Sequence, residues 1–366
     1  MKNKTFGVAI IGCGRIANHH MNSVILNKNF KLISVCDLDA LRGSHFSTKY
    51  NIPFYKDYRE MLTTESNIDL VVIATPSGMH FEHSLEVLKD FNKNIIVEKP
   101  TFMKLTEAKI IFDLASKKKL KVYPVFQNRF NSAVIRVKKA IESGELGEIR
   151  VSAVRVRWCR PQRYYDMSNW RGTFSHDGGA ITNQGIHHVD LLRYFCGEIE
   201  EVNCSMATLG SIIEVEDTVV ASYKHKSGAL GTLEITTAAR PDDYEASISL
   251  VCSKGIAQIG GVAVNKLEIL STSEKDCLNF SENFEELEGT SKVYGNGHKY
   301  IYKRIYDDLI LKESYKPDEE DCINTLKLLH SFYVSNEKKS IIKVKDGLES
   351  EYLGRKDESI SKLYRA

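Results

Sequence analysis

The chain has 366 residues, enough for two domains of ordinary size. Its 50 lysines and arginines nearly balance 48 aspartates and glutamates, and a net charge of +2 excludes the strongly basic field of a nucleic-acid-binding protein. No apolar run reaches the roughly 18–20 residues that cross a bilayer. The eight cysteines form no C-x-x-C pair. We therefore expect a cytoplasmic globular protein with reduced thiols, no membrane partner and no bound metal.

Short apolar segments alternate with helical patterns over the first third of the chain. The expected strands cover residues 6–11, 31–36, 69–74, 94–97 and 121–126, and the clearest helical patterns cover 82–91 and 105–117. Nearly continuous apolar strands of this kind need cover on both faces, as in a parallel sheet flanked by helices. The pattern predicts an α/β N-terminal Rossmann domain over residues 1–125.

The pattern changes in the second part of the chain. Residues 150–158 alternate as a strand does, and segments 217–223 and 229–237 flank a Ser227-Gly228 turn. Helical patterns cover residues 178–195, 300–312 and 319–335. We expect an α+β C-terminal domain over 126–366, built on a large open, mostly antiparallel sheet. Its exposed face predicts a homo-oligomer.

A glycine-rich turn follows the first expected strand. Gly12, Gly14 and Ala17 form a G-x-G-x-x-A motif that also contains Arg15 and Ile16. The first glycine permits a tight turn, the second lets the backbone approach a pyrophosphate, and the following helix presents free N–H groups to the anion. Asp37 ends the second strand, where a carboxylate binds the ribose hydroxyls and repels a 2′-phosphate. The motif predicts a dinucleotide site that prefers NAD.

Three further segments make the chain resemble the glucose–fructose oxidoreductase family, also called the inositol dehydrogenase family. They are Thr75-Pro76-Ser77 with His80, Glu98-Lys99-Pro100, and Gly178-Gly179 leading to His187 and Asp190. The resemblance implies a cis peptide before Pro100. It also implies cofactor contacts from Thr75, Pro76, Ser77, His80, Glu98, Lys99 and Gln127, beside Gly12, Gly14, Arg15, Ile16 and Asp37.

One departure from the family pattern is informative. Asn183 stands where the family usually has an aspartate four residues before the histidine. With the neighbouring residues it is similar to a subgroup that oxidises C3 of UDP-N-acetylglucosaminuronic acid, on the way to diaminouronic sugars of surface polysaccharides. The resemblance therefore implies an NAD-dependent sugar dehydrogenase.

Three residues are the expected catalytic groups. Lys99 follows a strand end, where its ammonium could stabilise a developing alkoxide. Asn183, His187 and Asp190 share one stripe of the expected helix. A histidine, with an ordinary pKa of about 6.5, suits proton abstraction, so we expect His187 to be the general base. Asn183 cannot ionise and should position the sugar, and Asp190 is equally compatible with orienting His187 and with a structural role.

Arginines and aromatic residues gather between residues 155 and 171. Guanidinium groups match a pyrophosphate or carboxylate, and aromatic faces can stack on uracil. We expect substrate contacts from Arg160, Arg163 and Tyr164 in the loop after the strand, together with Lys99, Asn183 and His187. The resemblance also implies that Gln127 and Arg129 lie near nicotinamide or sugar.

Other functions remain open on the sequence. The same chemistry could act on UDP-N-acetylglucosamine or another nucleotide sugar, or on a free sugar or inositol, and a non-enzymatic NAD-binding regulator is a further alternative. The resemblance implies a homo-dimer or homo-tetramer. Some relatives reoxidise NADH in place, which makes 2-oxoglutarate a possible second substrate.

Overall fold

The computed structural model describes residues 4–272, 282–283 and 297–365. The chain forms two compact units. The first consists of Met1–Val125, His298–Ile323 and Lys356–Ala366, and the second of Phe126–Gly297 and Asn324–Arg355. The expected boundary after residue 125 coincides with the first crossing between the units. The expectation that everything beyond it belongs to the second domain is wrong for the two later segments of the first unit.

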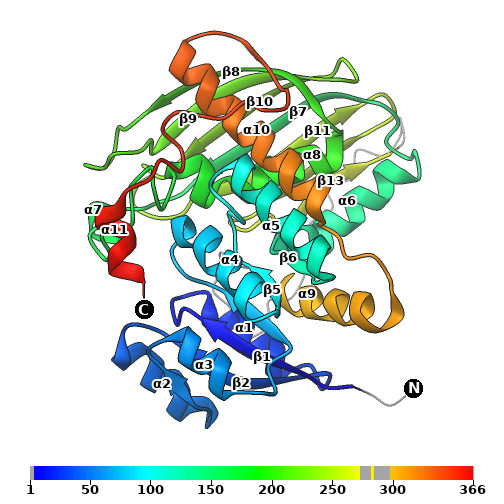
Figure 1. Ribbon diagram of the computed structural model, residues 1–366. Helices are drawn as coiled ribbons and strands as arrows, with labels where there is room; N and C mark the ends of the chain where they lie inside the picture. The colour runs from blue at the N-terminus through cyan, green and yellow to red at the C-terminus, as the bar shows by residue number, and fades with distance from the viewer. Residues whose placement is uncertain (1–3, 273–281, 284–296, 366) are drawn as a thin grey trace. The chain divides into compact units, whose positions relative to one another are not determined.

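The first unit is built on a six-stranded parallel sheet with the order β3-β2-β1-β4-β5-β6. This is the strand order of the dinucleotide-binding Rossmann fold. Figure 1 labels β1, β2, β5 and β6 of this sheet. The strands are β1 (Phe6–Ile11), β2 (Phe30–Cys36), β3 (Phe54–Tyr55), β4 (Leu70–Ile73), β5 (Asn94–Val97) and β6 (Val122–Pro124). All residues of β1 and β4 are buried, as their continuous apolar sequences predict. The two-residue β3 was not expected, because it is too short to show a pattern.

Helices connect these strands, and a late segment completes the core. The helices are α1 (Ala17–Ile25), α2 (Ala40–Tyr50), α3 (Tyr58–Thr64), α4 (His80–Asp90), α5 (Leu105–Lys118), α9 (Gly297–Tyr306) and α11 (Glu358–Ser361). Tyr302 of α9 packs edge-on against Phe30 with ring centroids 5.3 Å apart. The Tyr123 hydroxyl donates to the Asp308 carboxylate at 2.8 Å. These contacts explain why the segment after residue 297 belongs to the Rossmann unit.

The second unit contains a nine-stranded mixed sheet with the order β14-β13-β12-β11-β7-β10-β9-β8-β15. Its strands are β7 (Ile149–Arg157), β8 (Ile199–Ala207), β9 (Thr218–His225), β10 (Leu230–Thr236), β11 (Glu245–Cys252), β12 (Ile256–Gly260), β13 (Lys266–Ser271), β14 (Glu282–Asn283) and β15 (Ile342–Lys343). Only β7 and β10 pair in parallel among these strands. The expected β9–β10 hairpin and the mostly antiparallel sheet are confirmed.

One face of this sheet is covered and the other carries exposed apolar side chains. Four helices precede, separate or follow these strands along the chain: α6 (Ser132–Glu142), α7 (Gln162–Tyr165), α8 (Ile186–Cys196) and α10 (Glu319–Lys338). The Ser335 hydroxyl of α10 accepts from the Cys204 N–H of β8 at 3.0 Å. On the opposite face Val151, Val220, Leu230 and Val251 are exposed. Self-association through this face remains a prediction.

The segment before α8 differs from the expected continuous helix over residues 178–195. Gly178 and Gly179 have φ values of +79° and +72°, which L side chains rarely adopt and which end any helical path there. A π-helical turn, Ala180–Gln184, follows, and α8 begins only after Gly185. Asn183 therefore lies in the π turn and His187 in α8, so two helical elements replace the single regular helix that was expected.

Candidate active site

The glycine turn of the first unit has the shape that a dinucleotide requires. Gly12 has φ +98°, and a Cβ at this position would lie 2.5 Å from the Ala74 carbonyl oxygen. A Cβ at Gly14 would meet no atom within 4 Å, so the loop faces open space there. Helix α1 begins after Ile16 with no side-chain cap, so no capping side chain competes with an anion for the N-terminus of this helix. The turn therefore fits a pyrophosphate.

Asp37 is held beside this turn. Its Oδ2 accepts the Cys13 N–H at 2.6 Å and its Oδ1 accepts the Asp39 N–H at 2.8 Å. These bonds fix the carboxylate at the carboxyl end of β2, next to the turn. A fixed negative charge there fits the two hydroxyls of an adenosine ribose and repels a 2′-phosphate.

The loop after β4 is organised by a buried histidine. Thr75 and Pro76 lead into a 3₁₀ turn at Ser77–Met79, and His80 begins α4. The imidazole nitrogens of His80 lie 2.9 Å from the Pro100 carbonyl oxygen and 3.0 Å from that of Thr75. Burial lowers the pKa of His80. His80 thus ties the loop after β4 to the loop after β5, and a direct cofactor contact from it remains a prediction.

Lys99 follows β5 and is half-buried, and its peptide bond to Pro100 is cis, as expected. The preceding Glu98 is buried, and its carboxylate meets His20, His298 and the Lys99 backbone N–H. That Glu98 contacts the cofactor remains a prediction. The hydrogen bonds of its carboxylate are those of a group that holds the Lys99 backbone in place. The ligand atoms of His20, Glu98 and His298 lie within 4.8 Å of one another, the one group within the described ranges that could hold a cation.

Sequence reasoning missed this cluster because its members are far apart along the chain. His20 lies in α1 and His298 at the start of α9, 78 residues before and 200 residues after Glu98. The available signals were His20, three residues after Ala17 of the glycine motif, and the Gly297-His298 pair, which by itself is typical of a plain helix start.

The second unit brings His187 and Gln127 together. The Gln127 amide nitrogen lies 2.9 Å from His187 Nε2, and both residues are buried. The ring of Phe126 meets that of His187 edge-on with centroids 6.3 Å apart. Asn183 donates from its amide to the buried carboxylate of Asp177. The sequence reasoning did not single out Asp177, which lies just before the glycine pair.

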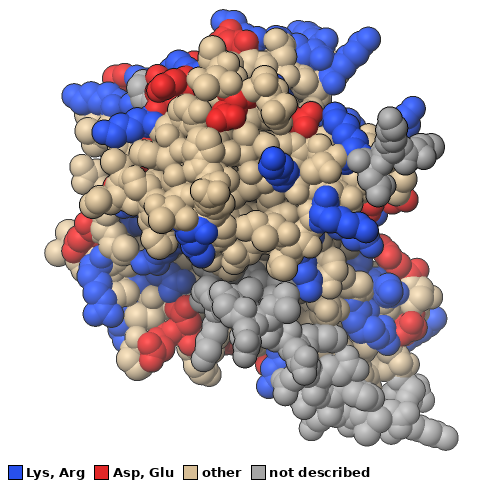
Figure 2. All heavy atoms as spheres, turned by 90° about the horizontal axis from the view of Figure 1, so that it is seen from below, with Lys and Arg blue, Asp and Glu red and all other residues tan. Residues whose placement is uncertain are grey.

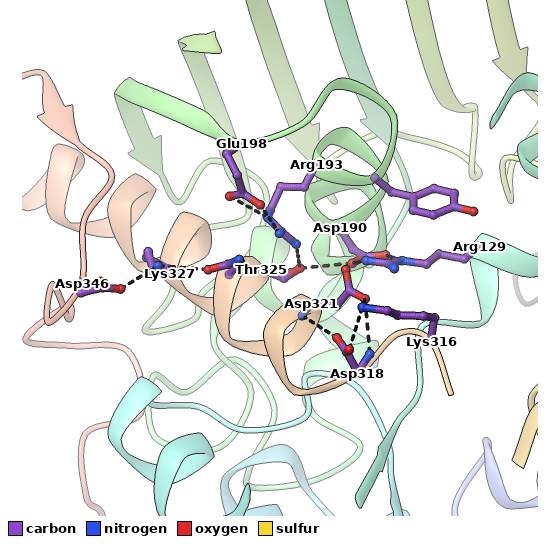
Figure 3. A network of polar contacts seen from close by, with 12 residues as sticks. Arg129, Asp190, Arg193, Glu198, Lys316, Asp318, Asp321, Thr325, Lys327 and Asp346 are labelled. Carbon is purple, nitrogen blue, oxygen red and sulfur yellow. Dashed lines mark hydrogen bonds and ion pairs between the residues drawn. The ribbon is translucent and has the colours of Figure 1, made fainter. Parts of the chain in front are cut away.

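Asp190 is a structural partner and not an orienting group for His187 (Figure 3). Its carboxylate accepts from Arg129 Nε at 2.7 Å and Nη2 at 2.6 Å, and from the Thr325 hydroxyl at 3.1 Å. Thr325 accepts in turn from Arg193 at 3.0 Å, and Arg193 pairs with Glu198. The guanidinium of Arg129 is buried and engaged twice by Asp190, and its expected contact with nicotinamide or sugar remains a prediction.

Of the three expected substrate residues after β7, one forms an ion pair within the described part of the chain. Arg160 pairs with Asp243 at 2.7 Å and lies over the ring of Trp158. The Tyr164 ring is covered by Arg171, with 4.3 Å between the guanidinium carbon and the ring centroid. Arg163 is exposed on α7. The loop thus gathers cations and aromatic faces, as expected, and its contacts with a substrate remain predictions.

Charged side chains of both signs lie on the surface of the protein. Figure 2 shows lysine and arginine side chains interspersed with aspartate and glutamate on the face drawn there. Within the described residues, no helix is long and apolar enough to cross a membrane.

Comparisons with known proteins agree with this reading of the two units. The model of the oxidoreductase family with an NAD-binding Rossmann fold matches residues 6–126, and that of the GFO/IDH/MocA C-terminal domain matches residues 134–258. The myo-inositol 2-dehydrogenase of Thermotoga maritima is 27% identical over 257 residues, 68% of this chain and 73% of that protein.

Two solved structures are similar over nearly the whole chain. The WlbA dehydrogenase of Bordetella pertussis, in complex with NADH and UDP-GlcNAcA, is 30% identical with a TM-score of 0.83, over 93% of this chain and 99% of that one. The WlbA dehydrogenase of Chromobacterium violaceum, with the same two ligands, is 32% identical with a TM-score of 0.84, over 94% and 98%. The chain belongs to the GFO/IDH/MocA family and is an NAD-dependent sugar oxidoreductase.

Proposed function

We propose that this GFO/IDH/MocA oxidoreductase oxidises the C3 hydroxyl of UDP-N-acetylglucosaminuronic acid to the 3-keto sugar. The observation that carries the proposal is the likeness over nearly the full chain to two dehydrogenases solved with that nucleotide sugar. The asparagine at position 183 and the cationic, aromatic loop after β7 support it, because both were expected for this substrate. The product would pass to an aminotransferase that supplies a diaminouronic sugar.

The residues of the first unit bind the cofactor and stabilise charge. The glycine turn and the α1 N-terminus hold the pyrophosphate, and Asp37 binds the adenosine ribose. NAD held by these residues would supply the hydride acceptor for the carbinol carbon. The Lys99 ammonium stabilises the negative charge that develops on the C3 oxygen as its proton leaves.

The residues of the second unit handle the proton and the sugar. His187 takes the proton of the C3 hydroxyl; because the Gln127 amide nitrogen lies 2.9 Å from Nε2, the hydroxyl replaces this contact when it reaches that nitrogen. Asn183, itself fixed by Asp177, orients the sugar ring through hydrogen bonds. The overall balance is one alcohol and NAD⁺ giving one ketone, NADH and a proton.

The expected substrate contacts after β7 distinguish the uronate from neutral nucleotide sugars. We assign the carboxylate to Arg160 or Arg163 and the uracil face to Tyr164. An Arg163→Gln variant should raise KM for the uronate about tenfold, and leave KM for UDP-N-acetylglucosamine within about twofold if that sugar reacts at all. Equal effects on both sugars would remove Arg163 from carboxylate recognition.

The position of oxidation is tested with substrate deuterated at C3. The proposal predicts that the deuterium is recovered on the nicotinamide of the NADH product, with a slowed hydride step. Unlabelled NADH from this substrate would refute oxidation at C3. A burst of NADH that 2-oxoglutarate discharges would extend the proposal to cofactor recycling in place.

A further inference from the structure

The His20–Glu98–His298 cluster is a closed hydrogen-bonded unit around one carboxylate. Glu98 Oε1 lies 2.8 Å from His20 Nε2 and 3.3 Å from His298 Nε2. Glu98 Oε2 accepts the Lys99 backbone N–H at 3.1 Å. All three cluster side chains are at most 5% exposed, so no solvent competes for these bonds. The three members come from α1, the end of β5 and the start of α9.

Tyr302 fixes the direction of the protons. Its hydroxyl lies 2.9 Å from His20 Nδ1, and burial raises the pKa of this phenol well above its usual value, so it keeps its proton. Burial also lowers the pKa of His20, which favours the neutral ring. A neutral His20 that accepts from Tyr302 at Nδ1 carries its proton on Nε2 and donates it to Glu98.

Glu98 remains a carboxylate in this setting. Burial alone would raise its pKa, but the hydrogen bonds from His20 and His298 outweigh burial and hold the pKa well below its usual value. A buried anion that accepts three N–H bonds has its orientation fixed by all three. Removing one donor frees the carboxylate to rotate or draws water into the site.

We propose that His20 and His298 are positioning residues for Lys99, because they hold Glu98 in the orientation that anchors the Lys99 backbone. The proposal rests on the catalytic role proposed above for Lys99. A lysine side chain has four flexible carbons, so a fixed backbone origin limits where its ammonium can reach. A displacement of about 1 Å at a catalytic group can cost about 100-fold in rate. Since His20 also belongs to α1, the same carboxylate links the cofactor-binding helix to the lysine.

The first test separates positioning from stability by kinetics. His298→Leu removes the donor and should lower kcat about 10- to 100-fold while KM for NAD stays within about threefold. His298→Gln restores an N–H at a similar reach and should recover most of the loss. His225→Leu is the matched control, a buried histidine of the second unit that meets Ser152 at 3.1 Å, and should lower the melting temperature without this loss of kcat. A fall of kcat in the control equal to that in His298→Leu would overturn the proposal.

The second test needs no sugar and so stands apart from the proposed function. Lysines of the NAD-bound protein are reductively methylated with ¹³C-formaldehyde, and the Lys99 resonance is assigned with Lys99→Arg. In His298→Leu this resonance should move towards the position of exposed lysines, and in His298→Gln it should stay near the wild-type position. An unchanged resonance in His298→Leu would refute the positioning role even if the sugar assignment held.

Metal analysis tests whether the His20–Glu98–His298 cluster binds a cation instead of positioning Lys99. The purified wild-type protein should contain well under one equivalent of transition metal, because the Glu98 carboxylate already accepts three N–H bonds, from His20, His298 and the Lys99 backbone. A stoichiometric metal that is retained by wild type and lost in His298→Leu would assign the cluster to a cation and overturn the positioning role.

Discussion

Replacing Asp190 by alanine should destabilise the second unit strongly. Asp190 and Arg129 have side chains only 1% and 5% exposed, and two short hydrogen bonds join them. Alanine would leave the Arg129 guanidinium buried without its counter-charge and deprive the Thr325 hydroxyl of its acceptor. Breaking a buried pair on one side costs about 3–5 kcal/mol. The double variant Arg129→Met with Asp190→Leu should cost clearly less than the sum of the two single variants.

Urea unfolding followed by tryptophan fluorescence measures the free energy of unfolding of the second unit. Both tryptophans, Trp158 and Trp170, lie in the second unit, so the signal reports on its unfolding. The control is Glu145→Ala, which breaks an exposed pair with Arg136 and should cost less than about 1 kcal/mol. A loss below about 1 kcal/mol in Asp190→Ala, equal to that of the control, would refute the reasoning that the buried pair organises this unit.

Three other changes test the catalytic and titratable groups. Lys99→Met and His187→Asn should each lower kcat by about 100-fold or more while NAD binding, measured by calorimetry, stays within about threefold; wild-type kcat in either variant would remove that residue from the reaction. Asp37→Ser should lower the ratio of kcat/KM for NAD over NADP by about tenfold or more, since it removes the repulsion of a 2′-phosphate, and an unchanged ratio would contradict the role of Asp37. Burial raises the pKa of Glu216 from 4.5 to about 8, so the folded state binds this proton more tightly and loses stability as pH rises from about 4.5 to 8. Glu216→Gln should flatten that part of the urea-stability profile, and an unaltered slope would count against a protonated Glu216.

The Rossmann unit was largely predictable because its signals are local. A buried parallel strand shows as a continuous apolar run, and the glycine turn shows as a fixed spacing between Gly12 and Ala17. The return of residues 298–323 to this unit was not predictable, because it depends on contacts such as Tyr302 with Phe30 across more than 270 residues. Nothing near Tyr302 in the sequence points to its partner.

The candidate site was predictable in its residue types but not in their partners. Lys99 and His187 were found from motifs, whereas the roles of Asp190 and Arg129 came only with the fold, which pairs them with each other. The continuous helix expected over residues 178–195 does not form, because Gly178 and Gly179 take positive φ values and a π turn precedes α8. Spacing along a sequence gives a face only where the helix is regular.

The most direct test of the central claim is NADH absorbance after the protein and NAD are mixed with UDP-N-acetylglucosaminuronic acid, with UDP-N-acetylglucosamine as the comparison. The absorbance of NADH is followed with and without 2-oxoglutarate, and NAD binding is verified separately by calorimetry. The account predicts that NADH forms with the uronate and at a much lower rate, or not at all, with the neutral sugar. Protein that binds NAD but reduces none of it with the uronate would contradict the nucleotide-sugar assignment.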